Sequence, residues 1–131
     1  HVLRVYIKAK GSDRTILISD GTAASGTVPG TYYLGAAKIQ SKPEGVVHLF
    51  GTQNLAGSAA TLLECLQNVI TWYNISLEQG IRWGSIHPRQ LLGWPTTQCV
   101  GDPAELLDWA YSKDRWNLAS VQLGTQIIKI H

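Results

Sequence analysis

The sequence predicts a mixed α/β fold that also contains antiparallel β structure, and two observations lead to this fold class. Residues 2–10 have helical spacing, and after a short turn the apolar, β-branched run at residues 15–18 follows. Helix, turn and buried strand in this order form the repeating step of an α/β sheet or barrel. Residues 31–50 instead have the composition of short antiparallel strands, and helical periodicity returns over residues 58–93.

The first helix is expected to end at Gly11, because glycine readily takes the left-handed conformation that closes a helix. The apolar run at residues 15–18 then stops abruptly at the polar residues 19–22. We therefore expect a buried parallel strand with a polar tip.

The middle of the chain is expected to form antiparallel strands. Residues 31–34 and 46–50 have strand composition, and residues 37–40 form a third candidate between them. Residues 42–45, with the sequence Lys-Pro-Glu-Gly, supply a hairpin turn with proline and glycine at suitable positions.

A longer helix follows, with an apolar stripe between residues 62 and 73. Ser58 is one candidate cap for its start, and Thr61 with Glu64 has the spacing of a capping box. Asn74 is expected to end this helix.

Two further helices and two strands complete the prediction. A capping box at residues 76–79 opens the second helix, and residues 87–93 form a third, with Pro88 in its first turn and Gly93 after its end. Local rules also predict a helix over residues 102–113. The last elements are candidate strands at residues 119–123 and 125–130, on either side of Gly124.

The composition is that of a globular protein, with 44% hydrophobic residues, 15% charged residues and a net charge of +2. The sequence has no run of basic residues, so nucleic acid is not an expected partner. It also has no apolar run near the roughly 20 residues that span a bilayer, so no membrane association is expected.

The cysteines and the start of the chain bear on its cellular context. Cys65 and Cys99 form neither a metal-ligand spacing nor a disulfide framework, which favours a cytoplasmic protein. The chain begins with His1 and contains no methionine. We therefore expect it to be part of a longer polypeptide.

Four stretches, in the same order and spacing, resemble the N-acetylglucosamine-6-phosphate deacetylases of the amidohydrolase superfamily. The first is similar to the last barrel strand and catalytic loop of that family, and the second to its substrate-contacting loop. The other two mark only the superfamily, and one of them has Pro-Arg where Pro-Ala is usual. The stretches are residues 16–26, 51–58, 86–93 and 101–107.

This resemblance implies the C-terminal portion of a (β/α)8 (TIM) barrel, comprising its last strand and closing helices, together with part of a small β-sandwich domain. Residues 1–28 and 54–95 would belong to the barrel. Residues 30–50 and 100–131 would belong to the β-sandwich. Residues 104–110 would then form a strand, against the local prediction of a helix.

The resemblance implies a catalytic role for Asp20, which lies at the C-terminal end of the expected barrel strand, where catalytic residues of such barrels gather. In the family, the aspartate at this position exchanges a proton with the attacking water and the leaving nitrogen. The alternative is structural, with the Asp20 carboxylate capping its loop through the amides of Gly21 and Thr22.

The resemblance also implies that Leu55, Ala56 and Gly57 line the sugar pocket. Gly57 permits a close approach of the backbone to a ligand. The amides before Ser58 would lie at a helix N-terminus, which suits polar or anionic groups. The alternative is a tight turn followed by a helix cap, which needs no ligand.

No metal ligand is assigned within this chain, because its four histidines form no His-x-His or His-x-x-x-His pattern. The resemblance implies a divalent metal ion, zinc or similar, held mainly by residues upstream. It also implies an amino-sugar phosphate as substrate, the rest of the enzyme chain as a partner, and a homodimer. The 131-residue chain alone is expected to be inactive.

The predicted activity is removal of the acetyl group from N-acetylglucosamine 6-phosphate, which gives glucosamine 6-phosphate and acetate. Two alternatives stay open. The first is another amidohydrolase, dihydroorotase-like or deaminase-like, although such enzymes lack the Leu-Ala-Gly-Ser signature at residues 55–58. The second is a non-catalytic small α/β binding or assembly module, in which all strands would pair within this chain.

Overall fold

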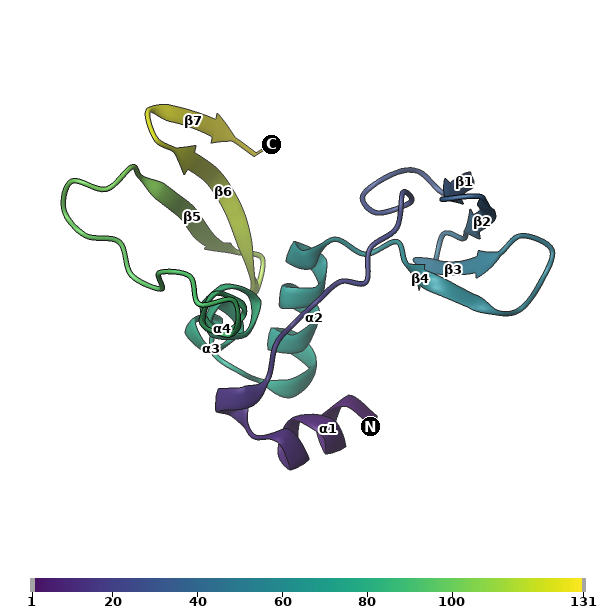
Figure 1. Ribbon diagram of the computed structural model, residues 1–131, viewed down its shortest axis with the longest axis horizontal. Coiled ribbons are helices and arrows are strands. Elements are labelled where there is room, and N and C mark those ends of the chain that lie inside the picture. Colours follow the sequence, from purple (N-terminus) through teal and green to yellow (C-terminus); the bar gives the residue numbers. More distant parts are fainter. Residues whose placement is uncertain (1, 131) are drawn as a thin grey trace.

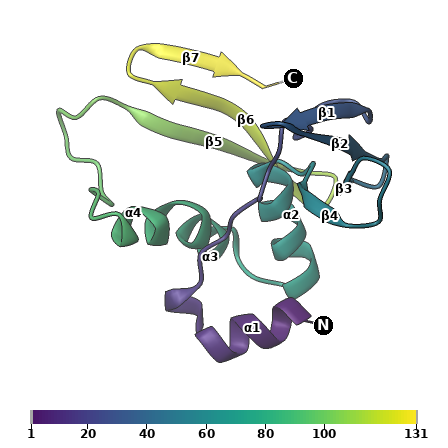
Figure 2. The same cartoon turned by 45° about the vertical axis from the view of Figure 1, so that its right-hand side comes forward.

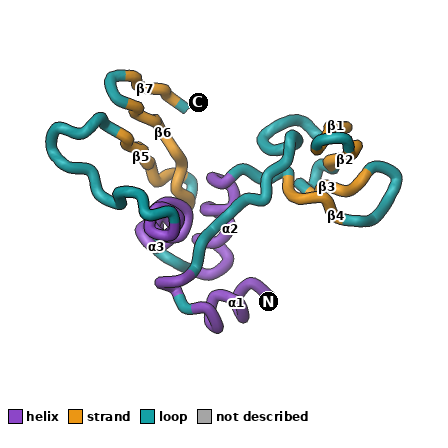
Figure 3. The backbone as a smooth tube through the Cα atoms, in the orientation of Figure 1, coloured by secondary structure: helices purple, strands orange, loops and turns teal. Residues whose placement is uncertain are grey.

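The computed structural model describes residues 2–130 and contains helices between two separate β-sheets (Figure 1). The four-stranded sheet and the three-stranded sheet lie on opposite sides of α2 in this view, and long loops connect them to the helices (Figure 3). Every strand within residues 2–130 pairs inside the chain, as a self-contained module would require, but in this range no strand of one sheet pairs with a strand of the other.

The first sheet is an antiparallel meander in the order β1-β2-β3-β4. The predicted hairpin at residues 42–45 is confirmed, since the Lys42 amide donates to the Val46 carbonyl at 3.0 Å. A small core of Ala24, Ile39 and Val47 packs on this sheet. The strands are β1 (Thr31–Leu34), β2 (Ala37–Ser41), β3 (Val46–Leu49) and β4 (Leu55–Ser58).

The second sheet is antiparallel in the order β5-β6-β7. It confirms the strand that the resemblance implied at residues 104–110, and the helix that local rules predicted over residues 102–113 is wrong. Every residue of β5 has a partner in β6, with a register shift after Asp108. The side-chain amide of Gln67 in α2 donates to the Trp116 carbonyl at 2.9 Å and attaches this sheet to the helices. The strands are β5 (Glu105–Ser112), β6 (Arg115–Leu123) and β7 (Gln126–Lys129).

The helices α1 (Val2–Lys10) and α2 (Leu62–Tyr73) agree closely with the predicted ranges. Thr61 caps α2 in a complete capping box with Glu64, and these hydrogen bonds hold the pKa of the Glu64 carboxyl below its usual value. The alternative cap, Ser58, is wrong because Ser58 is the last residue of β4. Asn74 ends α2 in the left-handed conformation, as predicted.

The two short helices predicted after Asn74 are one continuous helical run. It consists of α3 (Leu77–Ile81), a π-helical turn η2 (Arg82–Ile86) and α4 (His87–Leu91). Proline inside a helix removes one amide donor and clashes with the carbonyl four residues earlier. The wider π-turn ends at Ile86, two residues before Pro88, and makes room for this ring, so the helix widens where the sequence predicted a break.

The predicted parallel strand at residues 15–18 is wrong for this chain. No strand lies beside these residues in the part of the chain that the structure describes, so they have no ladder to join. The segment instead runs past α2 as an extended loop (Figure 1), and Ile18 is 70% exposed. A single parallel bridge between Gly21 and Ser58 connects its end to β4.

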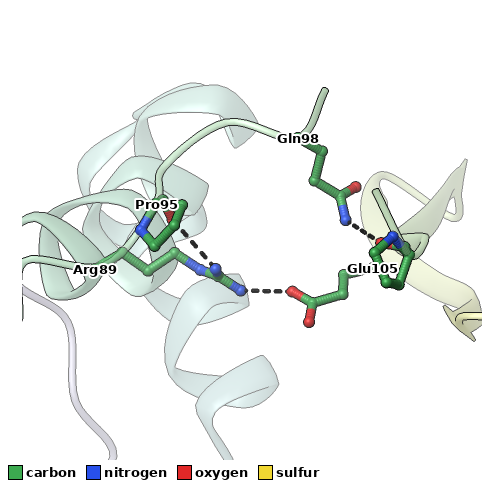
Figure 4. A network of polar contacts seen from close by, with 5 residues as sticks. Arg89, Pro95, Gln98 and Glu105 are labelled. Atoms are coloured by element: carbon green, nitrogen blue, oxygen red, sulfur yellow. Dashed lines mark hydrogen bonds and ion pairs between the residues drawn. The ribbon is translucent and has the colours of Figure 1, made fainter. Parts of the chain in front are cut away.

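A polar network joins α4 to the second sheet (Figure 4). The Arg89 guanidinium forms an ion pair with Glu105 at 2.9 Å and donates to the Pro95 carbonyl at 3.3 Å. Gln98 donates to the Pro103 carbonyl at 2.8 Å within the same loop. Because the Arg89–Glu105 ion pair is exposed, it contributes at most about 1 kcal/mol.

The chain exposes much more surface than a compact protein of its size. Its accessible surface is 9458 Å², whereas a folded monomer of 14.3 kDa exposes about 6,800 Å². None of the residues of α1 is buried, and the second sheet extends away from α3 and α4 (Figure 2). Among residues 2–130, no helix has the length and apolar character needed to cross a membrane.

Candidate active site at the Asp20 loop

Asp20 lies where the extended segment meets the first sheet, with its side chain exposed. Its φ angle of 49° is in the left-handed region, which aspartate tolerates better than most residues. The Asp20 carbonyl accepts a hydrogen bond from the Ser58 amide at 2.8 Å, and the Thr22 amide donates to the Ser58 carbonyl at 3.0 Å. These two backbone bonds flank Gly21 and fix the carbonyl side of Asp20 to the last residue of β4.

The Asp20 carboxylate does not cap its own loop. The Gly21 amide donates to the Ser19 hydroxyl at 3.2 Å, and the Thr22 amide is occupied by Ser58. The alternative role of Asp20, which needed these two amides, is therefore absent from the structure. The carboxylate keeps its lone pairs for a proton or another donor.

Gly57 lies directly against Asp20. A Cβ atom on Gly57 would lie 2.7 Å from Thr22 Cγ2, 2.9 Å from the Asp20 carbonyl oxygen and 3.7 Å from Asp20 Oδ2. The φ angle of Gly57 is also positive, at 81°. The two loops singled out from the sequence therefore meet in space, and the contact requires a residue without a side chain.

The other two predicted pocket residues differ from each other in burial. Leu55 is 72% exposed and pairs with His48 across the sheet. Ala56 packs against the core of the first sheet, which includes Ala24 from the loop after Asp20. A role for Leu55, Ala56 and Gly57 in substrate binding stays a prediction.

Sequence reasoning missed two hydroxyls that stiffen this loop. Thr22 Oγ1 and Ser25 Oγ donate to the Ser58 carbonyl at 3.2 and 3.3 Å, and Ser25 Oγ also lies 3.2 Å from the Ala60 carbonyl. Serine and threonine in small-residue loops often bond to nearby backbone groups, which is the one signal that the sequence offered. Their partners lie more than 30 positions away and were not foreseeable.

Two buried side chains of the helical run, Trp83 and His87, were also missed. They are 2% and 5% exposed, and both bond to the segment that leads to Asp20. The Trp83 indole donates to the Ser12 carbonyl at 2.9 Å, and His87 Nδ1 lies 2.7 Å from the Thr15 carbonyl.

The residues around Asp20 do not make a metal site by themselves. Zinc in proteins usually has at least three protein ligands. Within residues 2–130 no group of three or more histidine, cysteine, aspartate or glutamate side chains comes close enough to hold an ion. The neighbours of Asp20 are hydroxyls and backbone groups, and the expected ligands upstream stay a prediction.

No model of a known protein family matches the chain. Individual proteins do match. N-acetylglucosamine-6-phosphate deacetylase of Vibrio furnissii is 38% identical over 80 residues, which are 61% of this chain and 20% of that protein. The enzyme of the same name from Rattus norvegicus is 25% identical over 114 residues, or 86% of this chain and 27% of that protein.

Solved structures agree in fold over nearly the whole chain. The N-acetyl-D-glucosamine-6-phosphate deacetylase of Mycobacterium smegmatis superposes with a TM-score of 0.80 and 25% identity, covering 97% of this chain and 34% of that one. The deacetylase of Pasteurella multocida gives 0.81 at 22% identity, over 98% and 33%. The match to the latter is evidence for the fold alone.

The chain is homologous to N-acetylglucosamine-6-phosphate deacetylases and covers about a third of those chains in the structural matches. It spans between 20% and 27% of the length of the curated relatives reported above. The observed fold, mixed α/β with two antiparallel sheets, corresponds to part of the deacetylase structures.

Proposed function

We propose that this chain is the C-terminal part of a metal-dependent amidohydrolase that removes the acetyl group from N-acetylglucosamine 6-phosphate, releasing glucosamine 6-phosphate and acetate. The homology to enzymes named for this reaction supports the substrate class. The observation that carries the proposal is the contact between the Asp20 loop and Gly57, because it joins a free carboxylate to the loop expected to bind the sugar.

Asp20 is the group that moves the proton. Hydrolysis of an amide needs a deprotonated water as nucleophile and a protonated amine as leaving group. The Asp20 carboxylate takes the proton from the attacking water and returns it to the departing nitrogen. Two observations support this role. Asp20 is exposed, and the Gly21 and Thr22 amides bond to Ser19 and Ser58, so neither amide competes for the carboxylate oxygens.

The divalent metal, zinc or similar, would be bound mainly by residues that this chain does not contain. One carboxylate is too few ligands for such an ion. The 131-residue chain alone is therefore proposed to be inactive. The complete enzyme, by which we mean the longer polypeptide with this chain at its C-terminal end, is proposed to be a cytoplasmic homodimer.

Residues 55–57, which the structure places in β4, are the proposed contact for the sugar. Leu55 offers an exposed apolar side chain, and Gly57 offers bare backbone beside Asp20. One structure of the related Mycobacterium smegmatis enzyme contains N-acetyl-D-glucosamine-6-phosphate. That complex supports an amino-sugar phosphate as the class of ligand to test on the complete enzyme.

The test is Asp20→Asn in the complete enzyme. Asparagine tolerates the left-handed backbone of this position, so the loop keeps its conformation while the carboxylate is lost. The rate kcat should fall by about 10²–10⁴-fold, with the metal content unchanged. Asp13→Asn, at an exposed position of the helical turn at residues 12–14, is the matched control and should retain full activity. An Asp20→Asn enzyme with more than roughly a tenth of the wild-type rate would contradict the assignment.

A further inference from the structure

Three hydrogen bonds attach the segment before Asp20 to the helical run. The Trp83 indole donates to the Ser12 carbonyl at 2.9 Å, and the Leu17 amide donates to the Trp83 carbonyl at 2.9 Å. His87 Nδ1 lies 2.7 Å from the Thr15 carbonyl, which can only accept, so Nδ1 carries the hydrogen. These contacts fix residues 12–17 at three points.

The π-turn leaves the Trp83 carbonyl free to accept the hydrogen bond from the Leu17 amide. In a regular α-helix the Trp83 carbonyl would accept from the amide of residue 87. Here the His87 amide donates to Arg82, and the next residue, Pro88, has no amide hydrogen. The Trp83 carbonyl is therefore left without a helical partner, and the Leu17 amide occupies it.

Asp20 is the first residue of a second attachment, which follows closely after this one. Residues 12–17 are held by Trp83 and His87, whereas residues 20–22 are held by Ser58. Only two residues separate the two attachments. No strand within residues 2–130 pairs with the segment, so the helical run takes the place of a neighbouring strand.

We propose that Trp83 and His87 are positioning residues for Asp20, holding through the π-turn the segment that sets where the Asp20 carboxylate lies; this rests on the proposed function. The hydrogen bonds of these two side chains go to backbone carbonyls of the segment and not to the carboxylate, so their proposed role is positioning and not catalysis. A misplacement of about 1 Å at a reacting group can cost 10²-fold in rate. Residues 55–57 are held by the pairing of β4 with β3 and not by Trp83 or His87, so substrate binding should be affected much less than turnover.

The test uses single variants of the complete enzyme with N-acetylglucosamine 6-phosphate as substrate. Trp83→Phe removes the indole donor and keeps a large aromatic ring, and His87→Leu removes the imidazole donor. Both should lower kcat by about tenfold or more while KM stays within about twofold. His87→Asn should restore most of the loss, because its side-chain amide can donate from a position close to that of Nδ1. Trp109→Phe, a tryptophan of β5, is the matched control and should leave kcat unchanged.

A readout that does not depend on activity accompanies the kinetics. Hydrogen exchange at the Leu17 amide should be faster in Trp83→Phe and in His87→Leu, and close to wild type in His87→Asn. Faster exchange with unchanged kcat would overturn the positioning role, as would equal losses of kcat in His87→Asn and His87→Leu. A wild-type enzyme that binds the substrate but does not turn it over would refute the proposed function. If exchange at the Leu17 amide were still slow in that wild-type enzyme and faster in the variants, the attachment of the segment by Trp83 and His87 would stand although the deacetylase activity failed.

Discussion

Asp20 and Gly57 both occupy the left-handed backbone region, for different reasons. The Ser58 amide bonds to the Asp20 carbonyl and helps to hold Asp20 there, whereas at position 57 a side chain would also collide with Thr22 and with the Asp20 carbonyl. The sequence pointed to both residues through their motifs. It could not predict their contact, because that contact depends on a bridge between positions 21 and 58.

The substitution Gly57→Ala, compared with alanine at a second glycine of similar φ, distinguishes the effect of the steric contact with Asp20 from the effect of backbone strain. Gly57→Ala in the complete enzyme should lower kcat/KM at least about tenfold, which corresponds to roughly 1.4 kcal/mol of lost transition-state stabilisation. Its Cβ would lie 2.9 Å from the Asp20 carbonyl and would displace that residue.

Gly51→Ala is the control for this variant. Gly51 has a similar φ of 76° but nothing within 4 Å of an added Cβ. Both variants should lose about 1–2 kcal/mol of stability from the unfavourable backbone. Kinetics and melting temperatures of the folded variants distinguish the effects, and an equal loss of kcat/KM at both positions would remove Gly57 from the site.

At the scale of elements, the presence or absence of a neighbouring strand determined which local secondary-structure preferences were realised. Residues 102–105 have the composition of a helix start, yet β5 forms because β6 pairs with it along its whole length. Residues 15–18 have the composition of a buried strand, yet they form none because no neighbouring strand is available in residues 2–130. The capping residues Thr61, Asn74 and Ser76 were predictable, because each acts within a few residues of its own position.

Two glycines of the helical run should respond differently to alanine. Gly84 lines an apolar cavity of about 150 Å³ between α2, α3 and the second sheet, with Leu66, Leu107 and Trp109 among its walls. An added Cβ on Gly84 meets nothing within 4 Å, so Gly84→Ala should raise stability by about 1 kcal/mol through helix propensity.

Gly80→Ala is the matched comparison. Its Cβ would lie 2.3 Å from Leu66 Cδ1, so that side chain must shift and the gain in helix propensity is reduced or reversed. Thermal melting of the two variants of the complete enzyme should place Gly84→Ala above both wild type and Gly80→Ala. The reverse order would mean that the space beside Gly84 is filled in the complete enzyme.

At the scale of the whole molecule, the chain exposes about 2,700 Å² more surface than a compact protein of equal mass. The 44% hydrophobic content gave no sign of this, because composition does not say which apolar residues find partners. Large side chains of α1 and of β7 lie open to solvent, among them Leu3, Tyr6 and Ile127. Surfaces of this kind are normally covered in a stable protein.

The isolated chain should therefore associate with itself or aggregate. The apolar groove between α1 and α4, lined by Leu3, Tyr6 and Leu91, is one surface that would drive this association. Sedimentation of purified residues 1–131 should show species larger than a monomer at micromolar concentration, with strong binding of an apolar dye. A monomer with a cooperative melt in dilute solution would contradict the proposal that this chain is part of a larger enzyme.

A charge placed in this groove should have opposite effects on the isolated chain and on the complete enzyme. Leu3→Glu should reduce self-association of the isolated chain, because Leu3 is half exposed there and glutamate is well hydrated. In the complete enzyme the same groove is proposed to be covered by the rest of the barrel, so the buried carboxylate should lower stability by several kcal/mol. Lys8→Glu on the exposed face of α1 is the control, with little effect on stability in either case. If Leu3→Glu leaves the melting temperature of the complete enzyme unchanged, the groove is open to solvent there and the excess surface belongs to the protein itself.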